Sequence, residues 1–219
     1  IFLMPVASII IPCYDQGAFL AESAGSALAQ TLVDTEVIIV DDGSTEPETQ
    51  RALAAFRHPR ARVVRSANQG LAAARNLGIT QATGRYILPL DCDDRIAPTY
   101  LEKAVALLEA DPALGIVYCQ AEFFGQQGGP WLLPPYRFPE SIFQPALFCS
   151  GVFRRSDWQE AGGYNADMIH GYEDHDFWLA LIKRDRKVRQ IEEPLFFYRR
   201  TATSMVQAIT LEQKVASFM

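Results

Sequence analysis

The chain has 219 residues, of which 49% are hydrophobic, 11% aromatic and 21% charged. These proportions are typical of globular proteins and exclude a disordered or collagen-like chain. No apolar run approaches the roughly 18 residues of a membrane-spanning helix. The net charge of −6 argues against a general nucleic-acid binder, which carries a basic excess, but it leaves room for an acidic site that holds a divalent cation.

The cysteines and the N-terminal run give no sign of export or of a redox motif. None of the four cysteines has C-x-x-C spacing. The first apolar run lacks a basic head and is interrupted by Pro5 and Pro12, so we expect no secretory signal and a location in the cytoplasm.

The first half of the chain alternates short apolar runs with helical stretches. We expect strands at 7–11, where Pro12 ends the run, and at 36–40, 62–65, 86–90 and 115–119, and helices at 18–30, 47–56, 71–81 and 98–109. Apolar strands without polar alternation are buried on both faces, so the pattern predicts an α/β fold with a mostly parallel sheet and helices on both faces. Polar residues follow the strands directly, where open α/β sheets bind ligands.

The second half of the chain is less regular. The segment 124–144 contains three glycines and four prolines, so we expect a loop there, and a functional lid. Beyond it we expect a strand at 147–153, a short helix capped by Ser156 and ended by Gly162-Gly163, a helix at 172–184, and strands at 187–191 and 195–198. The tail 205–219 has weak periodicity, as in a truncated helix.

The densest acidic cluster is Asp91-Cys92-Asp93-Asp94, which follows a predicted strand. Alternate residues of an extended chain point the same way, so Asp91 and Asp93 can face one site and hold Mg²⁺ or Mn²⁺. The alternative is an acidic start of the helix that follows.

Two further strand ends carry polar residues. At Asp41-Asp42-Gly43-Ser44 a carboxylate can bind a ribose or a base N–H; the alternatives are an Asx turn or a phospho-acceptor receiver. The loop 68–70 leads into a helix that bears Arg75 and Asn76. Its start can attract an anion, while Asn76 can equally serve packing.

The fourth candidate segment is 171–176, at a predicted helix start. We expect the helix dipole to keep the pKa of Asp174 low, so that its carboxylate acts as a general base. The neighbouring His170 and His175 are more typical of surface or packed histidines than of ligands. Trp131, Tyr136 and Trp158 can stack on sugar rings, or pack in the core.

Together, the segments 12–15, 40–44, 68–76, 90–94, 151–164 and 171–174 resemble, in this order, the family 2 glycosyltransferases, which have the GT-A fold. The resemblance runs from about Val6 to Ser204. It implies a metal-dependent, inverting transfer of one sugar from a nucleotide-diphosphate sugar, most often a UDP-sugar, to the hydroxyl of a glycan or lipid-linked acceptor in bacterial cell-surface glycan synthesis. It also implies one domain over 1–219, with a nucleotide-sugar half at 6–119, an acceptor-side half at 120–204 and the tail.

The resemblance also implies roles for single residues. Tyr14 would stack on the base, Asp42 would contact the base or ribose, Asp91 and Asp93 would form the DXD pair with Mn²⁺ or Mg²⁺ on Asp93, and Asp174 would be the catalytic base. The implied donor-binding residues are Pro12, Tyr14, Asp42, Asn68, Arg75, Asp91 and Asp93, and the acceptor-side candidates are Glu173, His170 and Trp158.

The sequence departs from the family pattern at a few positions. Asp15 stands where many members have Asn, and Thr201 where many have His, so Arg200 or His170 would have to supply a third metal or phosphate contact. The absence of the Q-x-x-R-W motif of processive synthases argues for single-sugar transfer, by an enzyme in the cytoplasm or at the inner face of the cell membrane. The alternatives are a sugar-phosphate nucleotidylyltransferase and a sugar-nucleotide-binding module without turnover.

Overall fold

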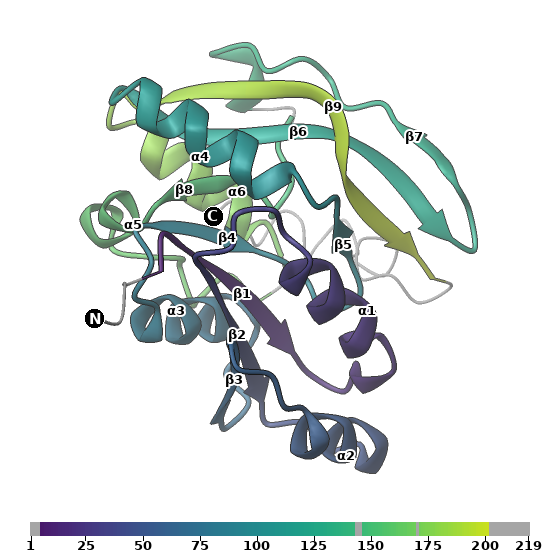
Figure 1. Cartoon of the computed structure of the whole chain (residues 1–219). Helices are drawn as coiled ribbons and strands as arrows, with labels where there is room; N and C mark the ends of the chain where they lie inside the picture. The colour runs from purple at the N-terminus through teal and green to yellow at the C-terminus, as the bar shows by residue number, and fades with distance from the viewer. Residues whose placement is uncertain (1–4, 143–145, 170, 202–219) are drawn as a thin grey trace.

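A computed structural model describes residues 5–142, 146–169 and 171–201 (Figure 1). Its strands form one mixed sheet: β1 (Ala7–Cys13), β2 (Thr35–Asp42), β3 (Ala61–Ser66), β4 (Tyr86–Pro89), β5 (Arg95–Ile96), β6 (Leu114–Gly125), β7 (Gly129–Trp131), β8 (Val152–Arg154) and β9 (Lys187–Arg200). The helices are α1 (Gly17–Leu28), α2 (Pro47–Ala55), α3 (Leu71–Gln81), α4 (Tyr100–Ala110), α5 (Arg155–Ala161) and α6 (Glu173–Ile182), with a 3-10 turn η1 (Glu140–Ile142).

The strand order explains where a ligand can bind. The order is β3-β2-β1-β4-β8-β6-β9-β5, with β7 paired to β6. The first four strands are parallel neighbours, and the chain crosses from β3 to the far side of β1 to form β4. The carboxyl ends of β1 to β4 therefore share one edge, and the crossing creates the switch point at which open α/β sheets bind ligands.

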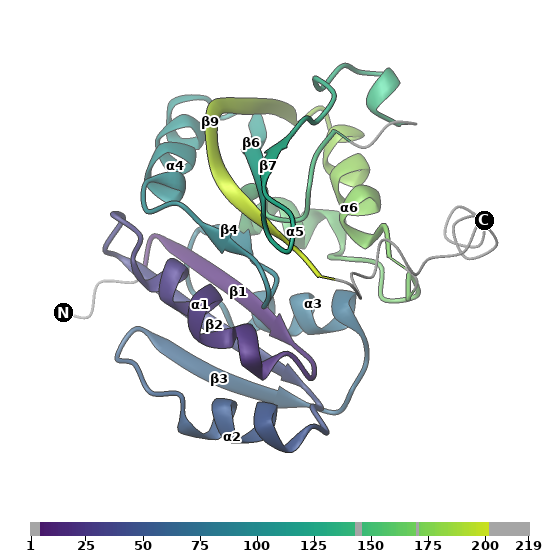
Figure 2. The ribbon, with the colours of Figure 1, turned by 90° about the vertical axis from the view of Figure 1, so that its right-hand side faces the viewer.

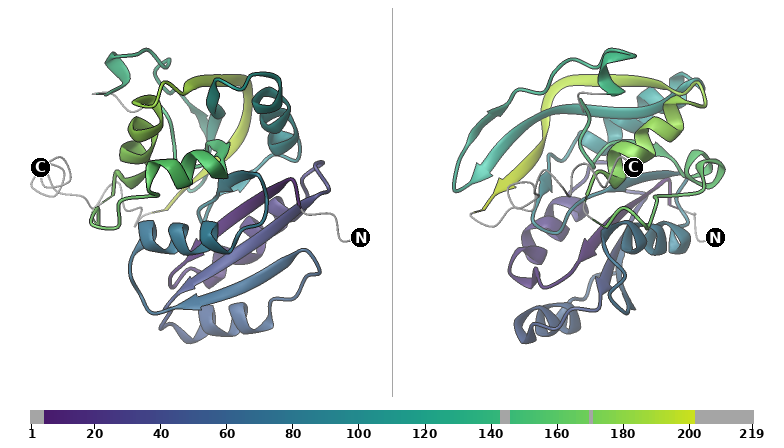
Figure 3. Two further views of the ribbon diagram at one scale, coloured as in Figure 1. Left: turned by 90° about the vertical axis from the view of Figure 1, so that its left-hand side faces the viewer. Right: turned by 180° about the vertical axis from the view of Figure 1, so that it is seen from behind.

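Helices cover both faces of the sheet. Helices α1, α2 and α4 lie on one face and α3, α5 and α6 on the other (Figures 1 and 3). The strands β1 and β2 are buried along their whole lengths, as their unbroken apolar runs predict. Helix α3 approaches them closely at Gly78, where a Cβ atom would lie 2.4 Å from Cγ2 of Ile10. The expected α/β fold, with parallel strands in the first half of the chain and helices on both faces, is confirmed.

The expectation that Pro12 ends the first strand is wrong, because β1 continues to Cys13. The carbonyl of Ile10 accepts a hydrogen bond from Leu90 N at 2.9 Å. The backbone N–H and C=O groups of the even-numbered residues of β1 therefore point toward β4. The pairing with β4 stops at Ile10 and Pro89. The missing N–H of Pro12 therefore points past the end of β4, where no ladder bond is lost.

The second half forms a curled extension of mixed strand direction (Figure 2), in which β6 and β9 are parallel. Strand β8 runs antiparallel to both β4 and β6. The two strands expected at 187–191 and 195–198 are one strand, β9, and the expected strand at 147–153 is shortened to β8. The expected loop at 124–144 begins with a β6–β7 hairpin, in which Trp131 stacks on Phe123 at 5.2 Å between ring centroids.

Two smaller expectations also changed. Helix α5 starts at Arg155 without a side-chain cap, so Ser156 does not cap it, although Gly162 ends it in the left-handed conformation as expected. Strand β5 was not expected, because two residues give no periodic signal. Within the described residues, no helix has the length and apolar character needed to span a membrane. The tail 205–219 lies outside the described residues.

Candidate active site

The loops after β1 and β2 are joined through Asp15. Its carboxylate accepts hydrogen bonds from the backbone N–H groups of Glu46 and Thr45, both at 2.8 Å, and from the Thr45 hydroxyl at 3.0 Å. The bond from Glu46 N is the main cause that lowers the pKa of Asp15. Asp15 therefore holds the two loops together through charge-assisted hydrogen bonds. An Asn at this position could accept the same bonds through its amide oxygen, but without the charge that strengthens them.

The loops after β2 and β3 are joined through Asp42, which is 4% exposed. Its two carboxylate oxygens accept hydrogen bonds from Gln69 N at 3.0 Å and Gly70 N at 2.9 Å. Gly43 has φ +74, and a Cβ there would lie 2.6 Å from Asn68 N. Asp42 thus orders the start of α3; its contact with a base or ribose stays a prediction.

The surface beside these loops has groups free to meet a planar ligand. Tyr14 is 45% exposed and Asn68 is exposed, while Pro12 is buried in β1. Asp41 accepts a hydrogen bond from Ser44 N at 2.9 Å, which is the Asx turn that the sequence offers as an alternative. The stacking of Tyr14 on a base stays a prediction.

The acidic motif after β4 divides into three environments. The Asp91 carboxylate accepts from Arg75 Nη2 at 2.7 Å and from the Cys149 thiol at 3.4 Å. Asp94 is 1% exposed; one oxygen accepts from Arg199 N at 2.8 Å, and the other has no hydrogen-bond partner among the described residues. Asp93 is half-buried between them, and burial, with the nearby charge of Asp91, raises its pKa to about 6.

Arg75 connects this motif to the second half of the chain. Its side chain is 1% exposed, and its guanidinium pairs with both Asp91 and Glu173. Burial of a cation is costly unless it is paired, so the two carboxylates stabilise it and raise its pKa against the effect of burial. Sequence reasoning gave Arg75 a place on the donor side; it did not reveal this link to α6.

Asp174 follows Glu173 in the first turn of α6. Its carboxylate accepts the backbone N–H of His175 at 2.7 Å. The expectation of a low pKa is wrong: burial, and then the charge of Glu173, raise the pKa of Asp174 to about 7 despite the helix start. Desolvation outweighs the dipole because the carboxylate lies beside a second, 5% exposed carboxylate. A carboxyl that titrates near neutrality is suited to general base chemistry.

Asn76 and Trp158 serve packing in this structure. The Asn76 amide oxygen accepts from Trp158 Nε1 at 3.0 Å and from Tyr164 N at 2.9 Å, and its nitrogen donates to Tyr164 O at 2.8 Å. The indole of Trp158 is half-buried. Its role as an acceptor-side candidate remains a prediction, with its N–H already in use.

Other candidates lie apart from these contacts or outside the description. His170 is not among the described residues, and His175 is buried in α6. Arg200 lies over the ring of Phe123, at 4.9 Å from its centroid. Tyr136 is half-buried, and Trp131 packs against Phe123 and Tyr198. Among the described residues, Trp131 thus belongs to an aromatic cluster with Phe123 and Tyr198.

Arg199 is a site residue that sequence reasoning missed. Its Nε donates to the carbonyl of Asp93 at 2.7 Å, its Nη2 pairs with Glu22, and its guanidinium lies 4.3 Å from the ring centroid of Phe124. The pairing of β5 with β9 positions it, with Arg95 opposite Phe197. Its signal in the sequence is its position two residues before Thr201, the place where many family members have His.

The residues present fit a divalent cation, although they do not form a complete metal site. Among the described residues, no three His, Cys, Asp or Glu side chains form a group that could hold a metal. However, one buried oxygen of Asp94 has no partner among the residues that the structure describes, and Asp93 carries a raised pKa, so Arg75 and Arg199 leave the negative charge of the motif incompletely compensated. Mg²⁺ is often held by one or two carboxylates together with substrate phosphates, so Asp93 and Asp91 suit that arrangement.

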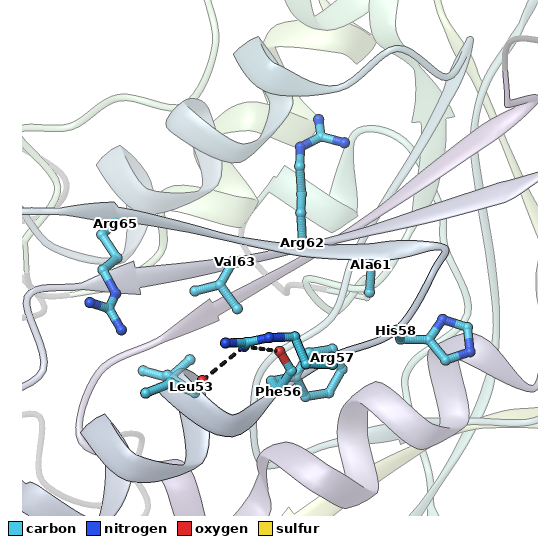
Figure 4. Close-up of a pocket in the computed structure, with 9 residues that line it drawn as sticks. Leu53, Phe56, Arg57, His58, Ala61, Arg62, Val63 and Arg65 are labelled. Atoms are coloured by element: carbon cyan, nitrogen blue, oxygen red, sulfur yellow. Dashed lines mark hydrogen bonds between the residues drawn. The ribbon is translucent and has the colours of Figure 1, made fainter.

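One hollow of the surface lies away from these residues. It has a volume of about 450 Å³ and lies between α2 and the edge strand β3, with Arg57, His58 and Arg65 around Phe56 and Val63 (Figure 4). The Arg57 guanidinium donates to the carbonyls of Ala54 and Phe56, so it closes the end of α2. None of the acidic residues discussed above lines this hollow.

Comparisons with known proteins agree with this geometry. Residues 8–166 match the family model described as glycosyl transferase family 2. The chain is 32% identical over 180 residues to the uncharacterized glycosyltransferase YibD of Escherichia coli K12, covering 81% of this chain and 48% of that protein. It is 31% identical over 185 residues to an Escherichia coli chondroitin synthase, covering 81% of this chain and 26% of that protein. The chain therefore spans half or less of the length of these relatives.

Solved structures share the fold at low sequence identity. The Staphylococcus aureus protein TarS in complex with UDP-GlcNAc superposes with a TM-score of 0.78 at 18% identity, covering 94% of this chain and 61% of that chain. The mannosyltransferase PcManGT of Pyrobaculum calidifontis, in complex with GDP-Man and Mn²⁺, gives 0.73 at 21% identity, covering 94% of this chain and 60% of that chain. The GT-A fold that the motifs implied is confirmed by these likenesses.

Proposed function

The chain belongs to glycosyl transferase family 2, and on that premise we propose that it transfers a single sugar, with inversion, from a nucleotide-diphosphate sugar to an acceptor hydroxyl. The observation that carries the proposal is the bridge from Asp91 through Arg75 to Glu173. It holds the acidic motif after β4 beside the start of α6, which bears Asp174. Donor-side acids and a carboxyl that titrates near pH 7 thus belong to one site.

In the proposed reaction, Asp174 accepts the proton of the acceptor hydroxyl. The freed oxygen attacks the anomeric carbon from the face opposite the diphosphate, a C–O bond forms, and the bond to the diphosphate oxygen breaks with its electron pair. Tyr14 would stack on the base, Asp42 would contact the base or ribose, and the exposed Asn68 and the buried Pro12 would complete the donor side. A divalent cation held by Asp93, with Asp91, would supply positive charge for the diphosphate.

The donor is proposed from the neighbours and not from this chain's residues. Solved structures with this fold include complexes with UDP, with UDP-GlcNAc, and with GDP-Man and Mn²⁺. Two relatives are named chondroitin synthase and hyaluronan synthase, which supports a role in glycan synthesis. We therefore propose a UDP-sugar as the most common type of donor and a glycan or lipid-linked molecule as acceptor. We propose that the half 6–119 binds the donor, that the half 120–204 binds the acceptor, and that Mn²⁺ or Mg²⁺ is the cofactor.

A nucleotide screen followed by a turnover assay tests this function. Thermal melting is measured with UDP, GDP, dTDP and CDP, each with Mn²⁺ or EDTA, and the sugar donors of the stabilising nucleotide are then assayed for release of the nucleoside diphosphate. The proposal expects stabilisation by one base and release of its diphosphate. Release of pyrophosphate from a nucleoside triphosphate would favour a nucleotidylyltransferase, and binding without any release, across acceptor glycans, would favour a binding module.

A further inference from the structure

A buried charge network joins both halves of the candidate site. Arg75, on α3, is 1% exposed and pairs through Nη2 with Asp91 at 2.7 Å and through Nη1 with Glu173. Its guanidinium lies 5.7 Å from the ring centroid of Tyr164. A single cation therefore connects a carboxylate 16 residues away with one 98 residues away.

Asp174 lies at the end of this network. Consecutive carboxylates repel, and the charge of Glu173 is the second cause, after burial, that raises the pKa of Asp174. Arg75 acts in the opposite direction, Asp91 adds to the rise, and the backbone N–H of His175 lowers it. Two further titratable groups face Asp174 from neighbouring elements, the Tyr164 hydroxyl and the Cys149 thiol. Both are neutral at pH 7, because burial raises their pKa values well above the ordinary range.

We propose that Arg75 is a positioning residue that sets the ionisation of Asp174, by neutralising Glu173 and fixing it between the acidic motif and α6. Glu173 then holds Arg75 in place and does not itself accept the proton. The proposal deepens the proposed function, since it rests on Asp174 as the base. Without Arg75, the buried carboxylate of Glu173 and the half-buried carboxylate of Asp174 would share the start of α6 uncompensated, and Asp174 would stay protonated at neutral pH.

A structural role alone would predict a different pattern from an electrostatic one. Removing Arg75 takes away a positive charge near Asp174, so the pKa of Asp174 should rise. Removing the charge of Glu173 takes away a negative neighbour, so the pKa of Asp174 should fall. Mere loosening of α6 would let water reach Asp174 and would move its pKa toward the ordinary value in both variants.

The experiment is a carboxyl-carbon NMR titration of Asp174 in the whole protein without added metal, with the signal assigned through Asp174→Asn. We compare Glu173→Gln, Arg75→Gln and the double variant with the parent. The control is Arg85→Gln, which removes an exposed arginine paired with Glu109 at 2.7 Å. We expect a fall of about one pKa unit or more in Glu173→Gln, a rise of similar size in Arg75→Gln, a value near the parent in the double variant, and no shift in the control.

The outcomes separate this inference from the proposed function. Arg75→Gln leaves Glu173 buried without its partner and can unfold; Arg75→Lys then takes its place, and its retained charge should keep the pKa of Asp174 within about half a unit of the parent. Shifts in the same direction for Glu173→Gln and the Arg75 variant, or no shift in Glu173→Gln, overturn the inference. If the shifts appear as expected but Asp174→Asn retains turnover, the inference on ionisation stands and the proposed base is wrong.

Discussion

The Asn76→Ala substitution should destabilise the protein through the contact between α3 and the segment 158–164. The amide of Asn76 makes three hydrogen bonds, one with Trp158 Nε1 and two with the backbone of Tyr164, at 2.8–3.0 Å. Each such bond contributes about 1 kcal/mol net, and the two donors and the carbonyl would be left in a half-buried place. We therefore expect a loss of about 3 kcal/mol in the free energy of unfolding.

Urea and thermal unfolding measure this loss. For a chain of this size about 1 kcal/mol lowers Tm by about 2–4 °C, so Asn76→Ala should melt about 6–12 °C lower. The control is Thr80→Ala on the same helix, an exposed position whose hydroxyl donates only to the carbonyl of Asn76, with an expected loss below about 0.5 kcal/mol. A loss in Asn76→Ala no larger than that of the control would refute the packing role of this amide.

Three further predictions concern the candidate site. Mn²⁺ should strengthen nucleoside diphosphate binding, and Asp93→Ala should remove that gain, because carboxylates and diphosphate repel without a cation; equal calorimetric affinities with Mn²⁺ and EDTA would contradict this. The lid expected at 124–144 should exchange its amide hydrogens more slowly beyond the β6–β7 hairpin once donor and metal are added, and full protection in the free protein would contradict it. The raised pKa of Asp174, about 7, predicts that turnover falls about tenfold per pH unit below pH 7, because only the carboxylate accepts a proton. Because the pKa of Asp174 is higher in the folded state than in the unfolded state, protonation of Asp174 stabilises the folded protein. This contribution should be lost as the pH rises from about 4 to about 7. Asp174→Asn should flatten this pH dependence of the free energy of unfolding, measured in urea.

Much of the nucleotide-side half could be predicted, because its signals are local. Unbroken apolar runs mark β1 and β2, and the helix expected at 71–81 is α3 with the same bounds. Parallel strands bring their carboxyl ends to one edge, so the polar residues after β1 to β4 could be expected to meet there. The notion that Asn76 must find partners if buried also follows from its apolar helix, and it has three.

The remainder depends on long-range contacts that no spacing encodes. The pairing of Arg75 with Glu173 joins residues 98 apart, and Arg199 reaches Asp93 from a strand 106 residues later. The pKa of Asp174 was expected to be low because only the helix dipole is visible in the sequence, whereas burial dominates in the structure. The hairpin at the start of 124–144 was not predicted, because its Gly and Pro residues are equally typical of loops.

The central claim is that Asp174, and not Glu173, is the general base, and the turnover of Asp174→Asn tests it most directly. The substitution keeps size and removes basicity, so turnover with the donor found in the nucleotide screen should fall by about 10²–10⁴-fold, while nucleotide affinity stays near that of the parent. Glu173→Gln, the matched control one residue away, should lose much less. Near-parental turnover of Asp174→Asn, with the large loss appearing in Glu173→Gln, would contradict the account.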